Sequence, residues 1–382
     1  MVGMEQIKEY GFDPGVQERA WRYQLDRLKL KIVYYAILLA LLLLFAAFGS
    51  AGLAGLIKGF THGPWPLNLL YTLIFALGFF ILGLPFDWGG YRIEQRFLLS
   101  TQILRSWLAD ELKAGVINLV IFLIAFPAIY IGVSQSNIWW LIAWAIVTLF
   151  IILMGFISPL VLMPLFFKFD PLEDEELARR LKELAERAKV KIIGVFKMAA
   201  GAKTRKAVGA LAGIGATRRI ILSDTLLENY TAEEIETVIA HELGHHVHRD
   251  IWKGIAGFSM IALLGFYIVH LALGPFAQGL GLGRGIASLP LFLIILGGVF
   301  FILAPLRNTF SRWFEGEADQ FALELAQRPE AQARVDVKLC DQNLRYAAPH
   351  PLIEFLFYDH PAGIKRVERA LKFGSGSDAI DP

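Results

Sequence analysis

The sequence predicts a multi-span α-helical membrane protein with about six transmembrane helices and one α+β insert. Its 382 residues are 55% hydrophobic and only 19% charged, with a mean hydropathy of +0.51, whereas soluble domains contain about 25% charged residues. The apolar residues gather in long blocks, as membrane spans require. One extended polar stretch, residues 168–250, separates the fourth block from the fifth. These three features together favour a bundle of spans that carries a water-facing insert.

Each apolar run has about 18 residues or more, enough to cross the roughly 30 Å core of a bilayer as a helix. The fourth run contains Pro159 and Pro164 near its end, which predicts either a kink there or an end that leaves the bilayer. The runs cover residues 32–56, 66–84, 115–134, 138–163, 252–274 and 287–306.

The runs divide the chain into segments for which we expect different roles. These are an amphipathic N-terminal arm (1–31), the first four spans with a cytoplasmic loop at 85–114 (32–165), the polar insert (168–250), the last two spans (252–310), a C-terminal segment (311–373) and a flexible tail (374–382).

Positive charge is distributed unevenly between the two sides of the predicted bundle. The arm, the 85–114 loop, the insert and the C-terminal segment hold most of the Lys and Arg residues, whereas the opposite loops hold only Lys58 and Arg284. Because Lys and Arg are enriched in cytoplasmic loops, we expect both termini and the insert to lie in the cytoplasm. The lipid bilayer is the first predicted partner.

The charge and cysteine content exclude other classes. A net charge of +2 is too balanced to indicate nucleic acid as a partner. The single cysteine, Cys340, excludes an intramolecular disulfide and a cysteine-rich zinc site.

The polar insert mixes helical and strand patterns. A helical period covers residues 175–189, and β-rich pieces cover Lys191–Met198 and Arg219–Leu222, on either side of the glycine-rich stretch Val208–Gly215. Thr231-Ala232-Glu233-Glu234 reads as a capping box, which predicts that a helix begins there and continues through residue 241.

Residues 241–245 read His-Glu-Leu-Gly-His, a pattern typical of zinc hydrolases. His241 and His245 are four residues apart, so they share one face of the helix and can bind the same metal ion. Glu242 lies about 100° around the helix from His241, within reach of a metal-activated water as a general base. The motif therefore predicts a catalytic zinc site.

A catalytic zinc ion usually takes three protein ligands and leaves one position open. Glu315 and Asp319, which follow the sixth span, form a second pair four residues apart. We expect Glu315 to bind the metal and Asp319 to orient one ligand imidazole. Glu317 lies on another face and is the weaker alternative.

Three further polar residues leave alternatives open. His248 returns to nearly the face of His241 and could support the site, although a solvated position at the helix end is favoured. Asp250 is expected to be a helix-end or loop residue rather than a ligand. His270 lies within the fifth run, where an ionisable residue suggests function, but an interfacial role is equally consistent.

Several segments resemble the integral-membrane zinc metalloproteases typified by the type I CAAX prenyl endoproteases, with bacterial heat-shock membrane proteases as more distant relatives. The resemblance spans most of the chain and rests on Tyr23-Gln24-Leu25-Asp26, Leu84-Pro85-Phe86, residues 219–227, His241–His245, residues 311–319 and His360-Pro361.

The resemblance implies one Zn²⁺ ion per chain, bound by His241, His245 and Glu315. Glu242 would activate the water, and Asp319 would support the site. The family fold also implies that the spans surround a chamber open to the cytosol and that the insert is of the gluzincin type.

The resemblance further implies that His360 stabilises the oxyanion formed during attack on the peptide bond. Substrate would add as a strand along the edge strand, here 208–213, with contacts to Val208, Gly209, Ala210 and Leu211. Two features depart from the family. Val208 stands where an asparagine is common, and the chain has six predicted spans where eukaryotic members have seven.

We therefore expect a membrane-integral zinc metalloendopeptidase. Its expected substrates are membrane-associated peptides or protein tails, and prenylated CAAX-type substrates follow from the resemblance alone. A quality-control protease with no prenyl requirement is the alternative. A non-proteolytic zinc-binding scaffold is disfavoured by Glu242, because a structural zinc site needs no base.

Overall fold

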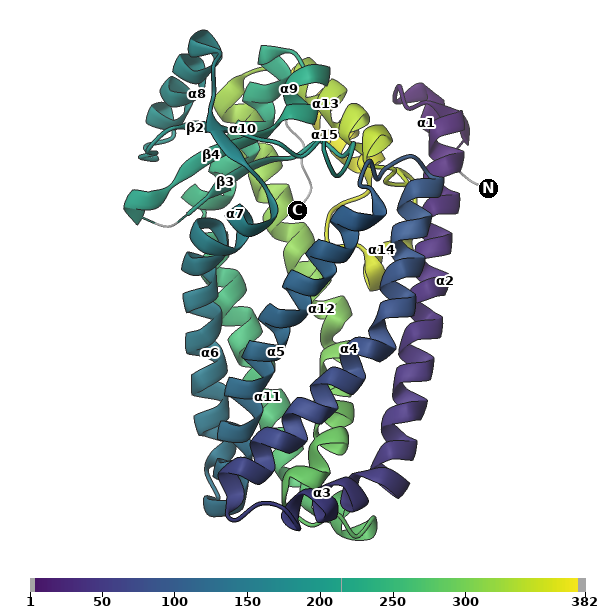
Figure 1. The fold of residues 1–382 in the computed structure, drawn as a ribbon. Coiled ribbons are helices and arrows are strands. Elements are labelled where there is room, and N and C mark those ends of the chain that lie inside the picture. The colour runs from purple at the N-terminus through teal and green to yellow at the C-terminus, as the bar shows by residue number, and fades with distance from the viewer. Residues whose placement is uncertain (1–3, 214, 377–382) are drawn as a thin grey trace.

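The structure, a computed structural model, describes residues 4–213 and 215–376. Six long helices lie side by side, and a small sheet with shorter helices covers one end of them (Figure 1). Helices α1 (Met4–Glu9) and α15 (Gly363–Gly374) lie at this same end. Among the described residues, six helices are long and apolar enough to cross a membrane, so the predicted fold class is confirmed.

The candidate spans coincide with the six apolar runs and extend beyond them. The first consists of α2 (Pro14–Leu44), a π-helical turn η1 (Phe45–Gly49) and α3 (Ser50–Lys58). The others are α4 (Pro64–Arg96), α5 (Leu104–Gln135), α6 (Trp139–Ile157), α11 (Asp250–Gly279) and α12 (Leu289–Ala326).

The predicted loop at 85–114 is wrong for most of its length. α4 continues through Pro85 to Arg96, and α5 begins at Leu104, so that only residues 97–103 connect the two helices. The polar residues of this region end the hydropathy signal without ending the helices, because Glu, Arg and Gln are good helix formers.

The N-terminal arm is also not one helix. α1 ends at Glu9, the chain turns through Gly11 at a φ of 84°, and α2 begins at Pro14. The Oδ1 of Asp13 accepts a hydrogen bond from the Gly15 N–H (2.7 Å) and caps α2. α2 then runs without a break into the first span. A flexible tail was predicted for residues 374–382. Gly374 is instead the last residue of α15, and residues 377–382 lie outside the described residues.

The end of the fourth span, where a kink or an exit from the bilayer was predicted, is an irregular helix. α6 ends at Ile157, a π-helical turn η2 covers Ser158–Leu162, and α7 covers Met163–Phe166. A proline at position 159 has no backbone N–H for the regular helical ladder, which accounts for the irregular turn.

The bundle has a buried interior and an apolar outside. Tyr71, Tyr130 and Phe292 are fully buried between the helices. In contrast, no residue in the most apolar 18-residue stretch of the Trp139–Phe166 span is buried within the protein. Such a surface is unfavourable in water and favourable in hydrocarbon, in agreement with a membrane location.

The part of the chain that covers one end of the bundle contains a four-stranded mixed sheet in the order β1-β2-β4-β3. Its strands are β1 (Phe169–Pro171), β2 (Val195–Met198), β3 (Gly209–Ala212) and β4 (Arg219–Ser223). β2 and β4 are parallel, whereas β3 pairs antiparallel with β4 and forms one edge. The two predicted β-rich pieces contain β2 and β4, and β1 was not predicted.

Helices surround this sheet and bring the C-terminal segment next to it. They are α8 (Glu175–Arg187), α9 (Asp224–Asn229), α10 (Ala232–Val247), α13 (Pro329–Gln342) and α14 (Pro351–Phe357), with the short 3₁₀ turns η3 (Gly215–Thr217) and η4 (Ile286–Ser288). Leu181, Leu222 and Leu243 are fully buried in one apolar cluster that joins α8, β4 and α10. This cluster packs α10 against the sheet.

Candidate metal centre

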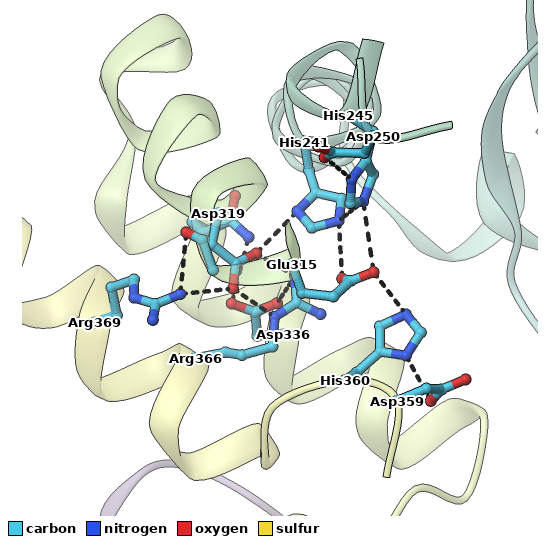
Figure 2. Close-up of polar contacts among 12 residues, drawn as sticks. His241, His245, Asp250, Glu315, Asp319, Asp336, Asp359, His360, Arg366 and Arg369 are labelled. Carbon is cyan, nitrogen blue, oxygen red and sulfur yellow. Dashed lines mark hydrogen bonds and ion pairs between the residues drawn. The ribbon is translucent and has the colours of Figure 1, made fainter. Parts of the chain in front are cut away.

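Helix α10 presents two histidine side chains on one face. Its start is fixed by the predicted capping box: Thr231 Oγ1 accepts from the Glu234 N–H (3.3 Å), and Glu234 Oε2 accepts from the Thr231 N–H (2.9 Å). About three to four turns further along the helix, the Nε2 atoms of His241 and His245 lie 3.1 Å apart (Figure 2).

Helices α10 and α12 approach closely at Gly244. A Cβ atom at this position would lie 3.0 Å from the Cα of Ala318, so any larger residue requires a shift of the backbone. The close approach brings the side chain of Glu315 to the histidines: its carboxylate oxygens lie 3.3 Å from His241 Nε2 and 3.5 Å from His245 Nε2.

The three side chains can hold a metal ion. One ligand atom of each lies within 4.8 Å of the other two. Glu315 Oε2 is buried, and its 3.3 Å contact with His241 Nε2 lacks good hydrogen-bond geometry; a buried carboxylate oxygen that is poorly bonded is costly. Two imidazoles and one carboxylate form the donor set of many catalytic zinc sites. The donors therefore fit a divalent metal.

Two carboxylates contact the imidazoles at Nδ1, the ring nitrogen that does not face Glu315. Asp319 Oδ1 lies 2.9 Å from His241 Nδ1, and Asp250 Oδ2 lies 3.0 Å from His245 Nδ1. Both contacts use Nδ1, which leaves Nε2 of each ring directed at Glu315 (Figure 2). Asp319 thus lies against an imidazole, and its role in orienting that ring stays a prediction. Asp250, expected to be only a helix-end residue, does the same for the second histidine.

A second layer of charge fixes Asp319. Arg366, on α15, donates from Nε and Nη2 to the two oxygens of Asp319 at 3.0 and 2.6 Å, and its Nη2 also lies 3.2 Å from Asp336. The two parallel hydrogen bonds define the plane of the carboxylate. Arg369 adds a longer contact to Asp319 (3.4 Å).

The environment changes the protonation of the metal-free histidine. Burial alone would lower the pKa of His241, but hydrogen bonds to Asp319 and Glu315 outweigh it and raise that pKa to about 10. His241 therefore holds a proton at neutral pH when no metal is bound, and metal binding must release it.

Glu242 lies between the helix and the edge strand. The Leu211 backbone hydrogen-bonds to its carboxylate, and burial raises the pKa of Glu242 although His241 and His245 oppose this. Strand β3 crosses α10 closely, because a Cβ atom on Gly209 would lie 2.6 Å from Val238 Cγ1. Glycine at position 209 is therefore required for this packing.

His360 lies on the loop between α14 and α15, beside the donor group. Its Nε2 is 3.2 Å from Glu315 Oε1, and its Nδ1 is 2.8 Å from Asp359 Oδ1 (Figure 2). The ring is 29% exposed, which leaves one side of it open to an incoming molecule.

Two sequence profiles together match nearly the whole chain. The profile of peptidase family M48 matches residues 171–373, which is more than half of the sequence. The chain belongs to peptidase family M48. A profile described as the N-terminal region of CAAX prenyl protease, with five membrane helices, matches residues 6–168.

Curated proteins similar to this M48 peptidase are metalloproteases. The chain is 30% identical over 336 residues to an uncharacterized metalloprotease, YhfN, of Bacillus subtilis, covering 84% of this chain and 78% of that protein. It is 27% identical to the CAAX prenyl protease 1 homolog of Arabidopsis thaliana (78% and 73% covered) and 26% identical to CAAX prenyl protease 1 of Saccharomyces cerevisiae (75% and 68%).

The fold is similar to that of a solved member. The crystal structure of S. mikatae Ste24p superposes with a TM-score of 0.83 at 19% identity, covering 95% of this chain and 90% of that one. The protein is thus a multi-pass membrane metalloprotease that hydrolyses peptide bonds.

Other residues considered from the sequence lie outside the donor group of the M48 peptidase. Glu317 pairs with Lys253 at 3.2 Å, and the ring of His248 packs edge-on against Phe321 at the end of α10. The ring of His270 packs against Trp139 and Trp140. Val208 precedes β3, and its N–H donates to Ser223 Oγ at 2.9 Å.

The sequence analysis missed Asp250 and Arg366. Asp250 carries a weak signal, because it follows His245 by only five residues. Arg366 is 47 residues from its partner Asp319, and no local pattern links the two.

Proposed function

We propose that the chain is a zinc endopeptidase whose Zn²⁺ ion is held by His241, His245 and Glu315. The observation that supports this most strongly is the convergence of two Nε2 atoms from α10, which also carries Glu242, with one buried carboxylate from α12. Zinc is the metal that this donor set favours. Bound there, it would act as a Lewis acid on the scissile carbonyl and on the attacking water.

Glu242 acts as the general base. It accepts a proton from the attacking water and delivers it to the leaving amine. Its raised pKa suits both steps, because a stronger base takes the first proton more readily and its conjugate acid can still give it up. The hydrogen bond from the Leu211 backbone positions the carboxylate beside β3.

His360 stabilises the oxyanion. The contact between Nδ1 and Asp359 at 2.8 Å fixes the orientation of the ring, with Nε2 directed at the donor group. Donation from Nε2 to the oxyanion lowers the barrier. Val208 has no side-chain donor, so in this chain His360 has no asparagine to assist it at that position.

Substrate adds as a strand to the exposed edge of β3. Substrate would contact residues 208–211 along this edge, next to Glu242; because both backbone groups of Val208 are bonded to Ser223, the backbone pairing would come from residues 209–211. Pairing through the backbone selects for an extended chain and not for particular side chains. Asp319 and Asp250 keep the imidazoles oriented while substrate binds.

The substrates are peptides or protein tails presented at the membrane, with the catalytic site facing the cytoplasm. The distribution of Lys and Arg supports this orientation, and similarity to proteins named CAAX prenyl protease 1 supports C-terminal prenylated tails as one substrate class.

The substrate class is tested with purified protein in detergent and matched peptides. A farnesylated CAAX peptide, the same peptide without the lipid and an unfolded membrane protein are offered at equal concentration, with Glu242→Gln as the blank. Faster cleavage of the farnesylated peptide supports a prenyl protease. Equal or faster cleavage of unmodified substrates contradicts a prenyl requirement and assigns a quality-control role.

The metal ligand is tested by Glu315→Ala. We expect zinc content, measured by atomic emission, to fall well below one ion per chain. Glu317→Gln, a change of carboxylate two residues away, is the matched control. Full zinc occupancy in Glu315→Ala would remove Glu315 from the ligand set.

A further inference from the structure

A pocket beside the metal centre contains two arginines that the peptidase chemistry does not use. It has a volume of about 430 Å³ and lies where the turn between α10 and α11 faces the start of β4. Its lining residues are Arg218, His245, His246, Arg249, Ile251 and Trp252. We call it the arginine pocket.

Neither arginine has an acidic partner. Within residues 4–213 and 215–376, no ion pair or side-chain hydrogen bond involves the guanidinium of Arg218 or Arg249, and Arg218 Nε is buried without an acceptor. By contrast the next residue, Arg219, donates to the carbonyl of Pro159. The guanidinium groups of Arg218 and Arg249 supply the positive charge of the pocket.

The arginine pocket lies near the ends of two candidate membrane spans. Ile251 and Trp252 belong to the first turn of the Asp250–Gly279 span and are 40% and 46% exposed. The contact from Arg219 to Pro159 places this part of the sheet at the end of the Trp139–Phe166 span. Two spans therefore end at the level of the pocket, and tryptophan is enriched at that level in membrane proteins.

We propose that the arginine pocket binds the phosphate of an anionic membrane phospholipid. A guanidinium matches the geometry of phosphate oxygens and remains charged at every physiological pH. Basic pockets between membrane helices on the cytoplasmic side bind lipid head groups in this way. The exposed side chains of Ile251 and Trp252 contact the glycerol and upper acyl region, while Arg218 and Arg249 contact the phosphate.

The phospholipid explains the chemistry of the pocket better than a peptide does. A peptide carboxylate would satisfy the arginines but would leave the two exposed apolar residues in the first turn of a span without a role. The inference goes beyond the proposed peptidase function, because neither arginine belongs to the metal donors or to the edge strand.

The test measures lipid retention by the full-length, zinc-loaded protein. Native mass spectrometry in detergent gives the affinity for short-chain phosphatidylglycerol in the wild type, in Arg218→Gln/Arg249→Gln and in a control, Arg92→Gln/Arg105→Gln. The control removes two exposed arginines from the ends of α4 and α5. Each arginine is expected to raise lipid affinity by about tenfold or less at a membrane surface. We therefore expect the pocket variant to bind the lipid about 30-fold more weakly than the wild type. The control should bind it like the wild type.

Competing probes identify the source of the anion. Phosphatidylcholine should bind more weakly than phosphatidylglycerol, and millimolar inorganic phosphate should not displace the lipid. Displacement by inorganic phosphate at low concentration would overturn the lipid assignment in favour of a free-phosphate site. Unchanged lipid affinity in the pocket variant, or displacement of the lipid by a peptide with a free C-terminal carboxylate but not by its amide, would overturn it as well.

A second measurement does not depend on the folding of the arginine variant. Phosphatidylglycerol with bromine on its upper acyl chain should quench tryptophan fluorescence less in Trp252→Phe than in the wild type. Equal quenching in the two proteins would contradict a lipid beside Trp252.

Discussion

Asp250, the first residue of a membrane span, lies 3.0 Å from the Nδ1 of His245. Asp250 is buried and also lies 3.0 Å from the ammonium group of Lys253, one turn along the same helix. The second histidine of the motif is therefore oriented by the helix that enters the bilayer. The contact links the metal centre directly to the position of α11.

Replacement of Asp250 by asparagine or alanine should weaken zinc binding by about 10–100-fold, the usual effect of removing a group that orients a ligand imidazole. Zinc affinity is measured by competition with a chelator of known affinity. Glu317→Gln is the matched control, because Glu317 also contacts Lys253 (3.2 Å) but no imidazole. Equal zinc affinity in the wild type and in Asp250→Ala would show that His245 needs no such support.

Replacement of Gly244 by alanine should separate α10 from α12. The added methyl group meets the backbone of Ala318, which cannot move as a side chain can, and overpacking of this kind costs about 1–3 kcal/mol. We expect a lower melting temperature and reduced zinc content, because Glu315 is carried on α12.

Gly254→Ala serves as the control for this change, since nothing lies within 4 Å of a Cβ atom at that position. If Gly244→Ala keeps the zinc content and melting temperature of the Gly254→Ala protein, the close approach of the two helices is not needed for the metal centre.

The parts of the fold that were predicted correctly have signals confined to a short stretch of chain. The apolar runs, the capping box at Thr231 and the irregular helix after Ile157 are all of this kind. The helical pairs His241/His245 and Glu315/Asp319 were recognised because four-residue spacing alone determines which side chains share a face.

The parts that were missed depend on geometry that spacing does not determine. The role of Asp250 requires the chain to turn at Arg249, which adopts a left-handed φ of 58°, so that a residue after the helix points back at His245. The role of Arg366 requires α15 to pack against α12. The 85–114 region was misjudged because the end of an apolar run marks the membrane boundary and not the end of a helix.

The capping box should make stability depend on pH. Burial alone would raise the pKa of Glu234, but the Lys338 ammonium group at 2.7 Å and the Thr231 N–H lower it below its ordinary value of 4.5. A carboxylate with a lowered pKa stabilises the fold above the unfolded-state pKa, and this contribution is lost as pH falls through the folded-state value.

Glu234→Gln should therefore be less stable than the wild type at pH 7, by about 1 kcal/mol, and the difference should shrink as the pH falls below 4.5. The comparison uses metal-free protein, so that loss of metal at low pH does not contribute. Glu233→Gln, the same change at an exposed neighbour, is the control. A difference that is equal at pH 7 and pH 4 would rule out the charge of Glu234 as its cause.

The most direct test of the proposed chemistry compares zinc content and peptide cleavage in Glu242→Gln. We expect one zinc ion per chain, as in the wild type, because Glu242 is not in the donor group, together with a fall in kcat/KM of about 10²–10⁴-fold from loss of the general base. Cleavage at the wild-type rate by zinc-loaded Glu242→Gln would contradict the assignment of Glu242 and the mechanism built on it.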